Sequence, residues 1–410
     1  MELKRLKRRI DTFYAAIQFS SFASSFVIFL YITVILQEKN FSNTEIGLTL
    51  ALGSGLSIVL PLLIAAFYAR HPHLPLRRVV AFVRFVTLVF SVLLIVVHSP
   101  VALVSLIVVV ISGTTISATS LVNALGMQFE TFGVPVNYGV ARAFGSLGCA
   151  MMAYASGLLA THLGGTAAVI GASVLLVAVT GICTLLFPVP ERTVEAAKHG
   201  TSPLPVSGVL GFRLLKSPAN LIFFVVMVLI WANMGVLDTY QVNILHSVGG
   251  NDMDFALMLA VMCISEVPLA LFFRPLAKRF SYVWLMTLGF AMLLLKNIIL
   301  IFAASVPAVI IAQVCNISTV AMFASAAAYY CNGIVSCEET VQVQALFTGT
   351  AMAAGRIVGN LLGGVILDNA GITALLLVCV GYALLSITLL QVSHRLRKKS
   401  AEPALAEAAS

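Results

Sequence analysis

The sequence contains few charged residues. Lys, Arg, Asp and Glu make up only 10% of its 410 residues, whereas 60% are hydrophobic and the mean hydropathy is +1.04. Since a soluble domain carries about 25% charged residues, this composition excludes an ordinary soluble globular protein. It indicates an integral membrane protein that is surrounded by lipid.

The sequence also lacks the motifs of several enzyme classes. It contains no G-x-x-x-x-G-K-[ST] phosphate-binding loop, no H-E-x-x-H motif, and no C-x-x-C pair among its seven cysteines. The seven histidines lie in loops or near the ends of apolar segments, where they form no buried cluster. We therefore expect no cofactor, no metal site and no enzymatic activity, and we interpret the cysteines as small core residues.

Long apolar segments fill most of the chain. Because about 20 apolar residues are needed for a helix to cross a bilayer, the sequence predicts an all-α membrane protein with twelve transmembrane helices. We expect these helices at residues 13–36, 44–69, 77–97, 101–127, 139–161, 166–187, 219–246, 255–276, 283–303, 307–332, 340–367 and 371–393.

The basic residues predict how the chain is oriented in the membrane. With the N-terminus inside, the inner segments carry 19 Lys and Arg residues, and the outer loops carry only Lys39. Since cytoplasmic loops carry the excess of basic residues, we expect both termini to be cytoplasmic in a plasma or inner membrane. The net charge of +8 follows from the same bias, so we expect no nucleic-acid partner.

The chain also contains an internal repeat. The one long connector, 188–218, falls between the sixth and seventh predicted spans. We therefore expect two six-helix halves, a known transporter architecture, with residues 1–187 as the N-terminal bundle, 188–218 as a cytoplasmic linker, 219–393 as the C-terminal bundle and 394–410 as a cytoplasmic tail. A shift of 207 residues places Pro61 on Pro268, Glu45 on Asp252, and Gly164 on Gly371.

Six charged residues lie in the interior of the apolar segments. A charge at the centre of a membrane helix costs roughly 2.5 to 3.5 kcal/mol, which indicates that such residues are retained for function. A carboxylate in low-dielectric surroundings takes up a proton readily, and a nearby cation opposes this uptake. We therefore expect at least one of the two acids to couple proton movement to transport. The six are Arg84, Arg142, Asp238, Glu266, Lys296 and Arg356.

A motif in the fifth predicted span resembles a transporter signature. Residues 137–148 read NYGVARAFGSLG, which is similar to the [YF]-G-x-x-R-x-x-G-[SC]-x-G pattern of the lactose-permease branch of the major facilitator superfamily. That branch includes oligosaccharide, nucleoside and phenylpropionate permeases. Asp238, Glu266 and Lys296 fall where the branch carries its span-seven acid, its sugar-binding glutamate and an arginine. The resemblance extends over essentially the whole chain and implies two pseudo-symmetric six-helix bundles.

The chain departs from that branch at several functional positions. The His and Glu that handle the proton in span ten are replaced by Asn316 and Thr319. Asn123 replaces the acid expected near the end of span four, and Cys149 replaces the aromatic residue that stacks on the galactosyl ring. These departures argue against a galactoside as the substrate.

The buried charges and the resemblance together predict a functional site. We expect substrate to contact Arg142, Glu266, Lys296, Asn123 and Asn316. Proton coupling or a salt-bridge network is expected at Asp238, Glu266 and Arg356, with Tyr240, Gln241 and Asn243 as further polar residues of the cavity.

These features predict a monomeric secondary transporter that carries a small organic solute with protons by alternating access. The four buried basic residues outnumber the two acids, which favours a carboxylate as the solute. A sugar or a nucleoside is the alternative solute. An exporter of the same superfamily, or a transporter-like sensor without flux, is the alternative function.

Overall fold

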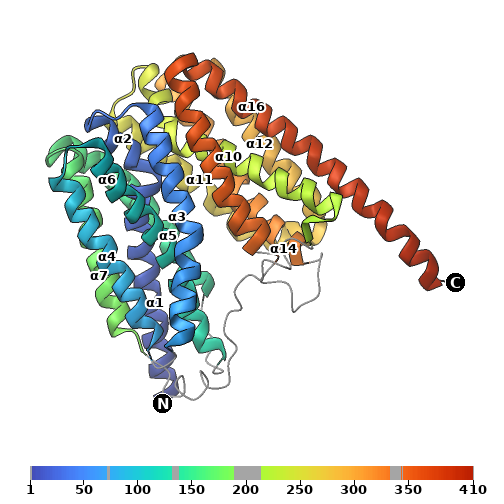
Figure 1. Ribbon diagram of the computed structural model, residues 1–410, viewed down its shortest axis with the longest axis horizontal. Helices are drawn as coiled ribbons and strands as arrows, with labels where there is room; N and C mark the ends of the chain where they lie inside the picture. The colour runs from blue at the N-terminus through green and yellow to red at the C-terminus, as the bar shows by residue number, and fades with distance from the viewer. Residues whose placement is uncertain are drawn as a thin grey trace. The chain divides into compact units, whose positions relative to one another are not determined.

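The computed structural model describes residues 2–71, 74–131, 138–188, 214–332, 343 and 345–409, and within these ranges it contains helices joined by turns and short loops (Figure 1). The chain divides into two compact units. One comprises Met1–Pro205 with Asn251–Cys263, and the other comprises Val206–Gly250 with Ile264–Ser410. Most of the predicted linker lies outside the described residues, as do the first residue of the fifth-span motif and part of the predicted span 340–367.

In the first unit, α1 packs against α6 and α7, α3 packs against α5, and α4 packs against both α5 and α7. The first three elements form one continuous helical stretch, so the helix that contains the first predicted span begins at Glu2, before the predicted residue 13. The elements are α1 (Glu2–Phe26), the π-helix η1 (Val27–Tyr31), α2 (Ile32–Glu38), α3 (Asn43–Arg70), α4 (Leu76–Val96), α5 (Val101–Thr131), α6 (Tyr138–His162), α7 (Thr166–Leu186) and the first part of α11 (Asp252–Arg279).

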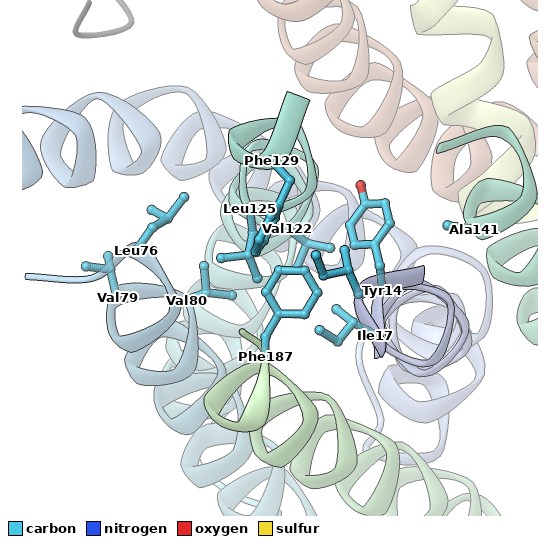
Figure 2. Close-up of a cluster of buried hydrophobic side chains, with 11 residues drawn as sticks. Tyr14, Ile17, Leu76, Val79, Val80, Val122, Leu125, Phe129, Ala141 and Phe187 are labelled. Atoms are coloured by element: carbon cyan, nitrogen blue, oxygen red, sulfur yellow. The ribbon is translucent and has the colours of Figure 1, made fainter. Parts of the chain in front are cut away.

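Aromatic and aliphatic side chains close one end of this unit. Figure 2 shows Phe187, which directly follows α7, among side chains from α1, α4 and α5. Its ring centre lies 6.3 Å from that of Tyr14 and 5.5 Å from that of Phe129. Because all three rings are buried, they join three helices through apolar contact at this end of the unit.

In the second unit, α10 packs along α16, and α12 packs against α16 and against the interrupted helix that follows it. The elements are α10 (Pro218–Ser247), the remainder of α11, α12 (Tyr282–Phe302), α13 (Val306–Ala312), the 3-10 helix η3 (Gln313–Ser318), the π-helix η4 (Thr319–Ala324), α14 (Ser325–Asn332), the π-helix η5 (Ala345–Thr350) and α16 (Ala351–Ala409).

The helices match the predicted spans, with two differences. Ten described helical stretches are long and apolar enough to cross a membrane. The eighth predicted span is helical as part of α11, but α11 is not one of the ten. The 28 residues of α11 include several charges and two prolines. The eleventh and twelfth spans count as one stretch because α16 combines two helices across Gly371. Figure 1 shows the chain turning sharply between them.

The internal repeat has a structural counterpart at two glycines. Gly164 follows α6 with a φ of 111°, and Gly371 joins the two parts of α16 with a φ of 76°. Residues with a side chain rarely adopt this left-handed backbone, whereas glycine does so at little cost. The 207-residue shift thus pairs two positions where the chain turns between successive spans.

A second repeated feature is the start of the second helix in each half. Ser42 and Glu45 form a reciprocal capping box at the start of α3, with bonds of 2.8 and 3.2 Å. Asn251 and Asp254 form the same arrangement at the start of α11, with two bonds of 3.0 Å. Each box satisfies helix N–H groups that would otherwise lack a partner. The acid that caps α11 is therefore Asp254, two residues beyond the position that the shift predicts.

Candidate functional site

Two of the predicted site residues form an ion pair in the second unit. Arg356 Nη2 on α16 donates to Asp238 Oδ2 on α10 at 2.6 Å. The two side chains are only 17% and 11% exposed, respectively. The Arg356 guanidinium also lies 6.0 Å from the ring centre of Trp231. Each charge is neutralised by the other, which offsets part of the cost of burying both.

Glycines allow this ion pair to form. A Cβ atom on Gly355 would lie 2.5 Å from the carbonyl oxygen of Val228, and one on Gly359 would collide with the Ala232 carbonyl. A Cβ on Gly235 would lie 3.3 Å from Arg356 Cα. Helices that cross this closely need small residues at the crossing. The close approach of α10 and α16 therefore depends on glycines of both helices.

Hydrogen bonds continue along the same crossing toward the predicted polar residues of α10. Thr239 Oγ1 donates to Asn360 Oδ1 at 2.9 Å, and the Tyr240 hydroxyl donates to the Asn360 carbonyl at 2.8 Å. Tyr240 is thus buried as a link between α10 and α16, and Gln241 is also buried, whereas Asn243 is half-buried.

Lys296 and Asn316, both predicted to bind substrate, contact each other. Lys296 lies on α12 and is 2% exposed, and its Nζ donates to Asn316 Oδ1 at 2.9 Å. Asp238 and Glu266 lie within electrostatic range of this ammonium group. Glu266 is half-buried on α11. The second unit therefore brings together Asp238, Glu266, Lys296, Asn316 and Arg356.

Asn316 lies where the tenth span departs from α-helical geometry. The span begins as α13, continues as 3-10 and π segments, and returns to α-helix at Ser325. Ser265 of α11 donates to the carbonyl oxygen of Gln313 at 3.3 Å, so a side chain satisfies a main-chain group of the 3-10 segment. Such segments within helices often mark functional sites. The side chain of Thr319, the other span-ten replacement, lies outside the described set.

Sequence reasoning missed a buried amide network beside these residues. Asn233 Nδ2 donates to the Cys379 carbonyl at 2.7 Å, and Asn297 Nδ2 donates to Asn233 Oδ1 at 3.3 Å. The signal in the sequence was an asparagine deep in each of two apolar segments, one of them next to Lys296. Several buried polar atoms of this unit lack a hydrogen-bond partner among the described residues, including Asn297 Oδ1, Gln241 Nε2 and Gln313 Oε1.

In the first unit, Asn123 belongs to a small polar cluster. Gln18 Nε2 lies 3.1 Å from Asn123 Oδ1 and 2.9 Å from the Tyr14 hydroxyl, so it can donate to both. Gln18 is fully buried on α1, and its Oε1 has no partner in the part of the chain that the structure describes. Gln18 is a polar neighbour of the predicted Asn123 that the sequence analysis did not identify.

Arg142 of the fifth-span motif is exposed within the first unit. Its guanidinium lies over the ring of Phe22 at 4.1 Å and donates to Ser146 Oγ at 3.3 Å. The motif glycines pack against α1, because a Cβ atom on Gly148 would lie 2.5 Å from the carbonyl oxygen of Phe19. The motif thus holds α6 close to α1 and presents the arginine beside an aromatic ring.

Arg84 differs from the other cations of the membrane segments. It is 1% exposed on α4 and donates to Ser21 Oγ, while its Nε and Nη1 atoms have no partner among the described residues. Arg84 therefore lies inside the first unit in this conformation and does not extend along its surface. No group of three or more His, Cys, Asp or Glu residues that could hold a metal ion occurs in the described ranges.

The comparisons with known proteins agree with this architecture. The sequence matches the model of the MFS_1 like family over residues 12–378. The structure is similar to the crystal structure of the nucleoside transporter NupG, with a TM-score of 0.79 and 17% identity over 96% of this chain and 99% of that chain.

Two peptide transporters of the POT family are also similar. One, in an auto-inhibited state, has a TM-score of 0.70 and 12% identity over 96% of this chain and 97% of that chain. The other, PepTSo, has a TM-score of 0.67 and 12% identity over 96% and 98%. The search of curated protein sequences gave no match. These similarities confirm the predicted fold class, an all-α membrane protein of two six-helix bundles.

Proposed function

Because this chain belongs to the MFS_1 like family, we propose that it is a secondary transporter that moves a small organic solute together with protons by alternating access. The observation that carries the proposal is the group of charged residues buried in the second unit. Arg356 pairs with Asp238 there, and Lys296 lies within electrostatic range of both Asp238 and Glu266. Ionisable groups within membrane helices are costly and mark proton or solute pathways.

The energy source is a gradient in this proposal. The sequence contains no phosphate-binding loop of the G-x-x-x-x-G-K-[ST] type, and a carboxylate between membrane helices can load a proton on one side and release it on the other. The Asp238 carboxylate is already engaged by Arg356 at 2.6 Å. We therefore assign the transported proton to Glu266, which is half-buried and senses the charge of Lys296.

The similar structures narrow the class of the solute only broadly. NupG is a nucleoside transporter and the POT structures are peptide transporters. At identities of 17% and 12%, this chain shares their fold, and their substrates are not carried over to it. A nucleoside, a sugar and an organic carboxylate therefore all belong in the first substrate panel. Both termini are cytoplasmic in this proposal, as the excess of basic residues in the inner segments indicates.

The test is the variant Glu266→Gln in liposomes with an imposed pH gradient. Wild-type protein should accumulate one member of the panel when the interior is alkaline. The variant should lose this pH-driven accumulation, because an amide cannot carry the proton, while solute exchange without a gradient should continue.

Glu45→Gln is the matched control. It makes the same chemical change at the start of α3, where a glutamine can still accept the bond from Ser42 N. The control should transport like the wild type. Normal pH-driven accumulation by Glu266→Gln would rule out Glu266 as the proton carrier, and wild-type protein that binds a solute without flux would indicate a sensor.

A further inference from the structure

Lys296 is a buried cation that forms no ion pair within 4.0 Å among the residues that the structure describes. Its ammonium group has three N–H donors, and a single hydrogen bond, to the neutral amide of Asn316, is made among the described residues. The residue is 2% exposed, so its side chain is shielded from bulk solvent in this conformation. A buried ammonium is strongly destabilised unless a negative charge lies close to it.

The nearby acids supply that charge unequally. The titratable side chains within electrostatic range of Lys296 are, from the largest influence to the smallest, Asp238 on α10, Cys315 on η3, Glu266 on α11 and Cys379 on α16. Asp238 is already neutralised by Arg356, which lies 2.6 Å away. The thiols are neutral at physiological pH unless they are activated. Glu266 is thus the acid whose ionisation decides whether Lys296 has a counter-charge.

This arrangement links the proton to the solute, and the following inference rests on the function proposed above. We infer that the solute carries a carboxylate group, which replaces ionised Glu266 as the counter-charge of Lys296 when Glu266 takes up its proton. One proton and one carboxylate then cross together, so each cycle moves no net charge. The proton comes from the solution on the loading side and returns to the solution on the other side with the solute.

The surroundings of Lys296 contain groups that suit such a ligand. Asn316 lies on the 3-10 segment η3, where the tenth span departs from α-helical hydrogen bonding. Gln241 Nε2 is a buried donor without a partner among the described residues. Gln241 lies three residues after Asp238, on the same face of α10, and Asp238 is within electrostatic range of Lys296. A carboxylate accepts several hydrogen bonds at once, and those from charged donors are the strongest.

The experiment compares each acid with its own amide, so that only the charge differs. The two pairs are glucuronate with glucuronamide and 3-phenylpropionate with 3-phenylpropionamide. Affinity is measured on purified full-length protein in detergent. Since a hydrogen bond to a charged group contributes about 1.5 to 3 kcal/mol, the wild type should bind the acid of at least one pair at least about tenfold more tightly than the amide.

Two opposite changes at the site should both remove this preference. Lys296→Gln removes the cation. Asn316→Asp keeps the cation but replaces the amide with a carboxylate, at the position where Asn316 Oδ1 accepts from Lys296 Nζ at 2.9 Å. The cation then has a permanent counter-charge supplied by the protein. Both variants should bind the acid and the amide of a pair within about twofold of each other, a smaller difference than one charged hydrogen bond produces. Because Asn316→Asp completes an ion pair, it keeps the test valid if Lys296→Gln fails to fold.

Arg84→Met is the matched control, since it also removes a buried cation that is bonded to a neutral side chain, but in the first unit. It should keep the preference for the acid. A wild type that binds acid and amide equally would overturn the inference, as would a folded Lys296→Gln protein that still prefers the acid, or a loss of preference in Arg84→Met.

Flux in liposomes separates this inference from the proposed function. An alkaline interior should drive uptake of the acid, and a potassium diffusion potential should leave the initial rate unchanged. A rate that follows the potential would overturn the one-to-one exchange. Binding of the acid without flux would refute transport and leave the Lys296 site standing. Flux of uridine or of an amide, with no preference for acids, would refute the Lys296 site and leave transport standing.

Discussion

Replacing Asp238 with Asn should destabilise the second unit by leaving Arg356 without its ionic partner. At a separation of 2.6 Å and an effective dielectric constant of about 20, the attraction of the two charges is about 6 kcal/mol before desolvation is subtracted. Removal of one partner from a buried pair costs about 3 to 5 kcal/mol. The two side chains are 17% and 11% exposed, so we expect a loss near the lower end, about 3 kcal/mol.

The two single variants should not be equivalent. In Asp238→Asn, the Arg356 guanidinium keeps its contact with the ring of Trp231, 6.0 Å away, which is worth about 0.5 to 1 kcal/mol. It can also still donate a hydrogen bond to the amide oxygen of the new asparagine. In Arg356→Gln, the buried carboxylate loses its cation and has no comparable aromatic contact. Asp238→Asn should therefore be the milder change, and the double variant should recover at least half of the loss seen in Arg356→Gln.

The assay is thermal unfolding of the purified protein in detergent, followed by the fluorescence of its two tryptophans. For a unit of 150 to 250 residues, 1 kcal/mol corresponds to about 2 to 4 °C, so Asp238→Asn should lower Tm by about 6 to 12 °C and Arg356→Gln should lower it further. The reasoning would be refuted if both single variants unfolded within about 2 °C of the wild type, or if the double variant were no more stable than Arg356→Gln.

Three further substitutions test the packing of the helices. Gly359→Ala places a methyl group against the Ala232 carbonyl and should lower Tm by several degrees. Gly381→Ala, in open space on α16, should leave Tm unchanged or raise it slightly. Equal effects of the two variants on Tm would refute the close crossing of α10 and α16. Gly371→Ala forces a φ of 76° on a residue with a side chain, and should cost about 1 to 2 kcal/mol in the same assay. Arg84→Met replaces a buried cation with an apolar side chain. Because two nitrogens of Arg84 have no partner among the described residues, Tm should stay the same or rise. A marked fall in Tm would show that the charge has a partner in the folded protein.

The fold could be predicted largely from the sequence because hydrophobic length is a local property. Where the structure describes them, the predicted spans lie on helical segments, and the repeat placed Gly164 and Gly371 at equivalent turns. Length and apolarity alone count fewer spans in the structure than the sequence predicts, because one helix is charged and another joins its neighbour. α11 carries charges at both ends and Glu266 within it, and α16 continues through the turn at Gly371 without a polar loop.

The candidate site was predictable only in part. A charge inside an apolar run is visible in the sequence, so Asp238, Lys296 and Arg356 could be named in advance. Their partners depend on how helices far apart in the chain approach each other. The bond from Asn297 to Asn233 joins residues 64 positions apart, and no periodicity within one helix encodes it. The irregular backbone around Asn316 is likewise invisible to hydropathy, because its residues are apolar enough for an ordinary span.

The buried charges of the second unit divide into a fixed pair and a changeable group. Asp238 and Arg356 lie at a crossing where glycines bring the backbones into contact, so the packing of α10 against α16 keeps the two side chains close together. Lys296 instead bonds to a 3-10 segment that already departs from the α-helical pattern, where hydrogen bonds can rearrange without breaking a regular helix. Loss of the pair should therefore appear mainly as loss of stability, and loss of Lys296 as loss of selectivity. A Lys296→Gln protein that is as unstable as Arg356→Gln would contradict this division, because both charges would then serve the architecture alone.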